Sequence, residues 1–332
     1  MSNKKRIYVI TLVVISMFII MPFTIQGRAV TTTVELTYKF SNLANPGADH
    51  YEGWLIVDGN AISTGSFTVD DQGNLKDLSN NTINSQTVSN IDLSKVSKYV
   101  LTLEPSGDSD PAPSSIKPLA GDFSDNKADL TPNLGVSLDN ISGGYILATP
   151  SDGANTNENS GIWWLDPNAG PGASLNLPNL TNTAWVYEGW IVFNATPVST
   201  GKFNTSAEFD SFDGYSGTQG YPPFPGEDFL KNAPSGLSFP TNLAGTKAVI
   251  SIEPRNDNSP APFQFKPLVA NIPTNAVDHH YYSMTDNSAA MASGSVTIKD
   301  TTTNAPFDGT YEAIFTLVAI FGLVRAKKRT NR

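Results

Sequence analysis

The amino-acid sequence predicts an all-β protein made of two similar modules in tandem. Apolar and polar residues alternate over several short segments, and a long segment occurs twice. No stretch between the two ends shows a convincing helical period. Alternation with a period of two is typical of half-buried β-strands, and a long internal repeat indicates one folded unit per copy.

The repeat consists of two blocks in the same order. Tyr51–Phe67 returns as Tyr187–Phe203 with eight identities over 17 residues. Glu104–Leu119 returns as Glu253–Leu268 with nine identities over 16 residues. The repeat motif that we single out from these blocks is Tyr51, Glu52, Trp54, Gly65, Phe67, Glu104, Pro105, Tyr187, Glu188, Trp190, Gly201, Phe203, Glu253 and Pro254.

The segments between the turn signals read as strands. The expected strands of the first copy are 34–40, 51–57, 62–69 and 99–103, followed by 145–148 and 162–165. Asp58-Gly-Asn60 predicts a hairpin turn, and Gly65 predicts a bulge or a close backbone approach. In the second copy, Ser293–Ile298 falls where Ser160–Leu165 fell.

About seven short strands per copy predict two tandem immunoglobulin-like β-sandwich modules. The expected modules are residues 31–168 and 170–302. A Trp on an alternating strand, present in both copies, is more simply a framework residue than a site residue. We therefore expect Trp54 and Trp190 to be largely buried at equivalent places.

The second copy is 13 residues longer than the first between its two blocks, and the surplus falls in an insertion at 206–237. This insertion is rich in Tyr, Gly, Pro and Phe, as in Tyr221-Pro-Pro-Phe-Pro225. Such a loop either forms a contact surface or covers the module with its own aromatic side chains. A short helical turn is expected at Glu227–Lys231.

The two ends of the chain read as targeting segments. Residues 1–29 have a basic start and an apolar run, typical of a secretory signal peptide, although an uncleaved membrane helix has the same pattern. Residues 303–332 contain an apolar run at 313–324 and then Arg325-Ala-Lys-Lys-Arg329. This order favours a C-terminal membrane anchor or sorting tail over a buried helix.

Composition narrows the class of protein. The chain has 332 residues, 16% charged residues and no cysteine, so disulfides and thiolate metal sites are excluded. Eight of its 21 basic residues lie in the two tails, which leaves 13 basic against 31 acidic residues. An acidic body of this kind argues against nucleic acid and anionic membrane surfaces as partners.

With both blocks in view, the chain resembles a known family. The order Tyr-Glu-x-Trp, Ser-x-Gly-x-Phe, then Glu-Pro and Pro-x-Pro is similar to the extracytoplasmic C-terminal domain of anti-sigma-K-factor-like proteins, here duplicated. The resemblance implies a β-sandwich ectodomain. It does not imply sigma-factor binding, because that family places the sigma-binding domain before the membrane segment, where this sequence has only Met1–Arg6.

The sequence offers no defensible catalytic, cofactor or metal residues. A glycosidase needs two carboxylates, but the Glu pairs 52/104 and 188/253 recur in both copies, which favours a structural role such as accepting backbone N–H bonds. Asn155-x-Asn157-x-Asn159-x-Gly161 has oxygen ligands at alternate positions, yet it does not fit a calcium loop. His279-His280 is an equally weak metal candidate. Candidate N-glycosylation sites are Asn80, Asn140, Asn179, Asn194 and Asn204.

These observations favour an exported, membrane-anchored and non-enzymatic cell-surface protein, with the C-terminal tail in the cytoplasmic membrane. Its role would be adhesion, envelope structure or sensing, with an envelope polymer or another surface protein as partner. The first alternative is the extracytoplasmic sensor of an anti-sigma-like signalling system. The second alternative is a secreted carbohydrate-active enzyme.

Overall fold

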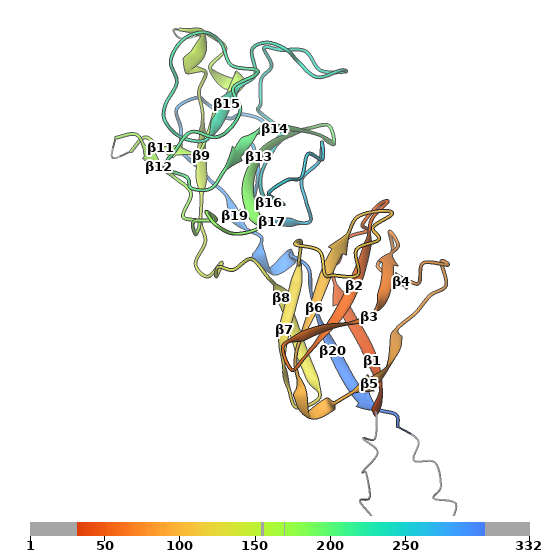
Figure 1. Cartoon of the computed structure of the whole chain (residues 1–332). Helices are drawn as coiled ribbons and strands as arrows, with labels where there is room; N and C mark the ends of the chain where they lie inside the picture. The colour runs from red at the N-terminus through yellow and green to blue at the C-terminus, as the bar shows by residue number, and fades with distance from the viewer. Residues whose placement is uncertain (1–31, 154–155, 169, 303–332) are drawn as a thin grey trace, which may run out of the picture. The chain divides into compact units, whose positions relative to one another are not determined.

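The computed structural model describes residues 32–302, except 154–155 and 169. The expected signal peptide, 1–29, and the expected tail, 303–332, lie outside these residues. The described part is almost all β, and every pair of neighbouring strands is antiparallel (Figure 1), which confirms the all-β prediction. Among the described residues, no helix is long and apolar enough to cross a membrane.

The first copy forms one hydrogen-bonded sheet with the order β4-β3-β2-β6-β7-β8-β20-β1-β5. Its strands are β1 (Thr32–Ser41), β2 (His50–Val57), β3 (Asn60–Val69), β4 (Leu75–Lys76), β5 (Ser85–Ile91), β6 (Val96–Glu104), β7 (Leu119–Ser124), β8 (Lys127–Pro132) and β20 (Ser293–Asp300). A 3₁₀ turn, η1 (Leu93–Lys95), precedes β6. Val34, Leu36 and Tyr38 are buried and alternate with less buried neighbours, as the period of two predicts.

The second copy forms two larger sheets and one small one. Their orders are β14-β13-β16-β17-β19, β15-β10-β9-β18 and β11-β12. The strands are β9 (Gly144–Leu147), β10 (Gly161–Trp163), β11 (Leu165–Asp166), β12 (Gly172–Ala173), β13 (Trp185–Phe193), β14 (Thr196–Phe203), β15 (Gly226–Asp228), β16 (Lys247–Pro254), β17 (Phe265–Asn271), β18 (Tyr282–Ser283) and β19 (Thr285–Asp286). The 3₁₀ turns are η2 (Pro150–Asp152), η3 (Glu158–Ser160) and η4 (Ser288–Ala290).

The same strand order occurs in both copies. The row β3-β2-β6-β7 of the first copy recurs as β14-β13-β16-β17. The row β8-β20-β1-β5 recurs as β18-β9-β10-β15. In this correspondence β10 takes the place of β1, and β9 takes the place of β20.

The two copies have exchanged their last strands. Glu253 follows Glu104 by 149 residues, and the same offset carries Gly144–Leu147 of β9 onto Ser293–Val296 of β20. Yet β9 pairs with β10 and β18 of the second copy, whereas β20 pairs with β1 and β8 of the first. Figure 1 shows β20 running between β1 and β8. Linear modules at 31–168 and 170–302 would give these two strands different partners.

The expected equivalence of Ser160–Leu165 with Ser293–Ile298 is therefore wrong. Strand β10, which contains Ile162, pairs like β1, and the strand equivalent to β20 is β9. Strands β9 and β10 are both short and apolar, so the local pattern alone did not show which of them is equivalent to β20. Hydrogen-bonding partners far away in the sequence decide the correspondence.

Aromatic pairs across neighbouring strands sit at matching places in both cores. Tyr51 lies opposite Phe67 with ring centroids 5.9 Å apart. Tyr187 lies opposite Phe203 with centroids 5.5 Å apart. All four side chains are buried, so the repeated aromatic residues of the motif are core residues.

Candidate functional site

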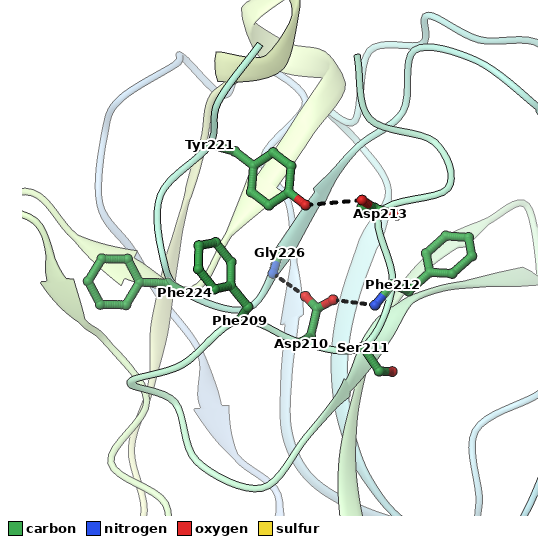
Figure 2. A pocket seen from close by; sticks show the side chains of 8 residues that line it. All are labelled: Phe209, Asp210, Ser211, Phe212, Asp213, Tyr221, Phe224 and Gly226. Carbon is green, nitrogen blue, oxygen red and sulfur yellow. Dashed lines mark hydrogen bonds between the residues drawn. The ribbon is translucent and has the colours of Figure 1, made fainter. Parts of the chain in front are cut away.

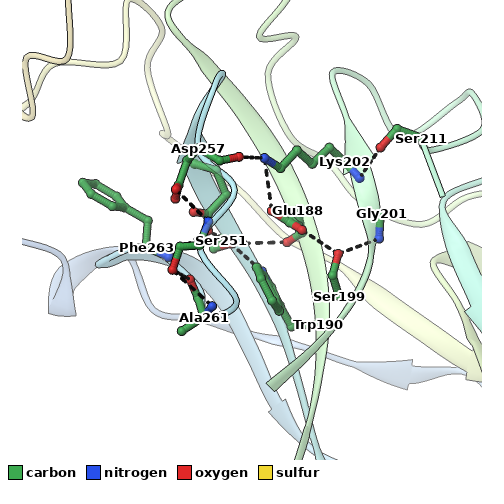
Figure 3. Close-up of polar contacts among 12 residues, drawn as sticks. Glu188, Trp190, Ser199, Gly201, Lys202, Ser211, Ser251, Asp257, Ala261 and Phe263 are labelled. Carbon is green, nitrogen blue, oxygen red and sulfur yellow. Dashed lines mark hydrogen bonds and ion pairs between the residues drawn. The ribbon is translucent and has the colours of Figure 1, made fainter. Parts of the chain in front are cut away.

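The two Trp residues of the repeat motif are buried, as expected. Trp54 is 4% exposed and Trp190 is 2% exposed. Trp54 Nε1 donates to Thr102 Oγ1 at 2.9 Å, and Trp190 Nε1 donates to Ser251 Oγ at 2.8 Å. Figure 3 shows Trp190 pointing toward Ser251 across β13 and β16. A buried indole needs such an acceptor, so both copies supply one at the same position.

The second Glu of each copy continues this hydrogen-bonded chain. Ser251 Oγ donates to Glu253 Oε1, which also accepts from the Phe263 backbone N at 2.8 Å. In the first copy, Thr102 Oγ1 donates to Glu104, which accepts from the Ser114 backbone N at 3.0 Å. Burial raises the pKa of Glu253 to about 7.

The first Glu of each copy is also held by the framework. Glu52 accepts a hydrogen bond from Ser63, and Glu188 accepts one from Ser199. Glu188 is further approached by Lys202, with 3.8 Å between Nζ and Oε2 (Figure 3). Burial raises the pKa of Glu188. These bonds agree with the structural role predicted for all four Glu residues.

The predicted bulge is present in both copies. The strand register shifts between Gly53 and Trp54 opposite Gly65, and between Gly189 and Trp190 opposite Gly201. Gly65 has φ +108° and Gly201 has φ +123°, a backbone conformation that favours glycine.

The side chain that covers this bulge differs between the copies. A Cβ on Gly65 would meet Gln86 of β5, whereas a Cβ on Gly201 would meet Asp210 of the insertion. A carboxylate in the second copy thus replaces an amide in the first. The bulge of the second copy therefore lies beside the carboxyl group of Asp210.

The insertion is fixed to the second copy by buried carboxylates. Glu227 and Asp228 are both 0% exposed. Glu227 accepts from Ser216 Oγ, and Asp228 accepts from the Ser151 backbone N at 2.8 Å and from Trp163 Nε1 at 2.9 Å. Burial raises the pKa of Glu227 to about 8 and also raises that of Asp228.

The helical turn expected at Glu227–Lys231 is wrong. The segment begins inside strand β15, which pairs with β10 through Ile162 and Glu227. Phe229 follows as a fully buried core side chain. The donors that satisfy the two buried carboxylates and the pairing of β15 with β10 favour the extended conformation over the local preference for a turn.

A pocket of about 210 Å³ opens within the insertion, beside the first residue of β15 (Figure 2). We call it the insertion pocket, and its lining residues are Phe209, Asp210, Ser211, Phe212, Asp213, Tyr221, Phe224 and Gly226. Phe209 is 56% exposed and Phe212 is 39% exposed, and they are two of the four large exposed hydrophobic side chains among the described residues.

Asp210 is held at the pocket by two backbone donors. Its Oδ2 accepts from the Gly226 N at 2.8 Å, and its Oδ1 accepts from the Phe212 N at 2.9 Å (Figure 2). Burial raises the pKa of Asp210 to about 7. Tyr221 donates its hydroxyl to Asp213 Oδ2 at 3.2 Å.

The aromatic rings of the insertion divide between the two predicted roles. Tyr221 packs on the buried Trp163 with centroids 5.4 Å apart, and Tyr215 stacks on Phe229 at 5.8 Å. Phe209 stands edge-on to Tyr221 at 5.8 Å and stays largely exposed. The insertion therefore covers the body with Tyr215 and Tyr221 and leaves the ring of Phe209 exposed.

The length and composition of the insertion single it out in the sequence, but they do not mark Phe209, Asp210 or Asp213 individually. No local signal marks Asp210, because its significance comes from the backbone donors and rings that the folded loop places around it. The repeated Glu residues, by contrast, were visible in the sequence and belong to the framework.

The weak metal candidates do come together in part. Glu158, Asp278 and His279 have ligand atoms within 4.8 Å of one another. His279 Nδ1 is already 2.9 Å from Asp278 Oδ2, and Asp278 and His279 are exposed. Asn155 lies outside the described residues. We assign no metal to this cluster.

Four of the five candidate N-glycosylation sites are exposed, namely Asn80, Asn140, Asn179 and Asn194. Asn204 is half-buried, and its Oδ1 accepts from Arg255 Nη1 at 3.0 Å. Glycan attachment is sterically open at the first four sites.

Known proteins add no identification. No protein-family model matches the chain, and neither a curated protein nor a solved structure matches it significantly. The resemblance to the anti-sigma-K-like ectodomain therefore remains a prediction.

Proposed function

We propose that the chain is an exported, membrane-anchored and non-enzymatic cell-surface protein that recognises a ligand through the insertion pocket. Its two copies would be immunoglobulin-like β-sandwiches that carry this pocket outside the cell. The role would be adhesion, envelope structure or sensing. The observation that carries the proposal is an aromatic, acidic pocket on the segment that is 13 residues longer in the second copy than in the first.

The surroundings of the carboxylates support binding rather than hydrolysis. Glu104 and Glu253 are 2% and 1% exposed, and Glu227 is 0% exposed. A glycosidase presents both of its carboxyl groups to the glycosidic bond. Of the acidic residues around the insertion, Asp210 and Asp213 line the pocket, and Asp210 is already bonded to two backbone donors.

Two measurements on the full chain in its producing cells test the proposal. A membrane-impermeant amine reagent applied to intact cells should label the protein, and purified full chain should retain envelope material on a column. A Phe209→Ala variant should be labelled as strongly as the parent protein on intact cells but should retain less envelope material on the column. Labelling only after lysis would exclude surface display.

The same material separates the two alternatives. Recovery of a sigma factor or its membrane regulator by crosslinking in intact cells would favour the sensor of an anti-sigma-like system. Release of sugars from envelope polysaccharide, abolished by Asp210→Asn, would favour a carbohydrate-active enzyme. The proposal predicts neither result.

A further inference from the structure

The insertion pocket is acidic and aromatic, and its side chains include no positive charge. Of its eight lining residues, two are carboxylates, four are aromatic, and none is Lys, Arg or His. The face of an aromatic ring is electronegative, so rings and carboxylates attract the same kind of ligand. An anionic ligand would meet repulsion from Asp210 and Asp213 without a cation to offset it.

We propose that the insertion pocket binds an organic cation of the ammonium type. This inference deepens the proposed binding function and rests on it. The rings of Phe209 and Tyr221 would contact the alkyl groups of the cation, while Asp210 and Asp213 would balance its charge. Figure 2 shows the rings of Phe209 and Tyr221 and the carboxyl group of Asp210 gathered around one space.

The size of the pocket fits a small head group. At about 210 Å³ it lies below the range of roughly 300–1,000 Å³ that is typical of pockets for drug-sized ligands. An ammonium head group or a single Lys side chain fits this space better than an oligosaccharide. The hydroxyl of Tyr221 already donates to Asp213, so it is committed as a donor within the wall.

The protonation of Asp210 links binding to pH. Its raised pKa, about 7, means that the carboxyl group is substantially protonated in neutral solution, and a bound cation would favour the ionised form. The titratable groups around it are Asp213 and Tyr221 in the insertion and Glu227 on β15. On β14, Lys202 is engaged with Glu188. Affinity for a cation should therefore rise between pH 6 and pH 8.

The test is a calorimetric titration of the full chain with tetramethylammonium chloride and with choline chloride. The control ligand is 3,3-dimethyl-1-butanol, a neutral molecule with the shape of choline. Nα-acetyl-lysine amide and methyl glucoside complete the set, so that a lipid head group, a protein side chain and a sugar are distinguished. We expect both quaternary cations to bind about tenfold more tightly than the neutral control.

The variants locate the binding. Phe209→Ala and Asp210→Asn should each weaken tetramethylammonium binding by about tenfold. Leu78→Ala is the control for Phe209→Ala, because Leu78 is also a large exposed apolar residue, 65% exposed, and lies in the first copy. This control variant should bind like the parent protein. Phe209→Ala removes an exposed ring, so its fold should survive even if Asp210→Asn disturbs the loop.

Several results would overturn the inference. Equal affinity for the neutral control, preference for methyl glucoside, or unchanged binding in both pocket variants would each exclude a cation site here. If no cation binds but Phe209→Ala still abolishes envelope retention, the proposed function survives and the ligand class is wrong. If envelope retention is itself absent in the parent protein, the proposed function fails.

Discussion

The hydrogen-bonded chain below Trp190 makes a quantitative prediction about Ser251. Its hydroxyl accepts from Trp190 Nε1 and donates to Glu253, and Ser251 is 0% exposed. Ser251→Ala leaves the indole N–H without this acceptor, which costs about 1–3 kcal/mol, and removes a bond to a carboxyl group worth about 1.5–3 kcal/mol. Because the two terms share one network, we expect a combined loss of about 3 kcal/mol.

The assay is thermal unfolding of the full chain by calorimetry. A loss of about 3 kcal/mol corresponds to a fall in Tm of roughly 4 °C, because a chain of 332 residues has an entropy of unfolding of about 0.7 kcal/mol/K. Ser251→Thr is the control, because Thr102 fills the same role in the first copy and should restore most of the stability. A Ser251→Ala variant within about 0.5 kcal/mol of the parent protein would refute the reasoning.

Three further predictions follow from the fold and the pocket. Folding raises the pKa of Glu227 from 4.5 to about 8, so the contribution of this group to the free energy of unfolding should be greatest below pH 4.5 and should fall as the pH rises toward 8. Glu227→Gln should reduce that fall in a series of Tm measurements over this pH range. Gly201→Ala should displace Asp210, because the new Cβ would come within 3.0 Å of its side chain. We expect this variant to bind tetramethylammonium more weakly in a calorimetric titration. Unchanged affinity would contradict the role of the bulge in positioning Asp210. Thr37 and Thr297 are direct partners on β1 and β20, and the chain contains no cysteine. The double variant Thr37→Cys/Thr297→Cys should therefore form a disulfide under mild oxidation, which mass spectrometry would detect. Free thiols after oxidation would argue against the pairing of β20 with β1.

Local patterns in the sequence predicted the strands and the framework well. The burial of Trp54 and Trp190 and the bulge at Gly65 follow from alternation and from the conformational freedom of glycine, which are properties of short segments. The structural role of Glu104 was predicted from its recurrence as Glu253, because a residue present in both copies is more simply explained by a shared framework than by two catalytic sites.

Local sequence patterns did not predict which strands pair when they lie far apart in the sequence. Alternation marks β9 and β20 as strands, but it does not say which sheet each of them joins, and their exchange became visible only in the hydrogen-bonding register. The pocket is a similar case. Asp210 and Tyr221 are ordinary loop residues in the sequence, and they face one space only after β15 has docked against β10.

The central claim is that the repeated motif is the framework and that the insertion pocket is where the protein recognises its ligand. The direct test is retention of envelope material by immobilised full chain, measured for Phe209→Ala and Ser251→Ala at a temperature where both variants are folded. We predict that Phe209→Ala has the Tm of the parent protein but does not retain envelope material. Ser251→Ala should have a lower Tm but should still retain envelope material. The opposite pattern would move the binding site to the repeated motif.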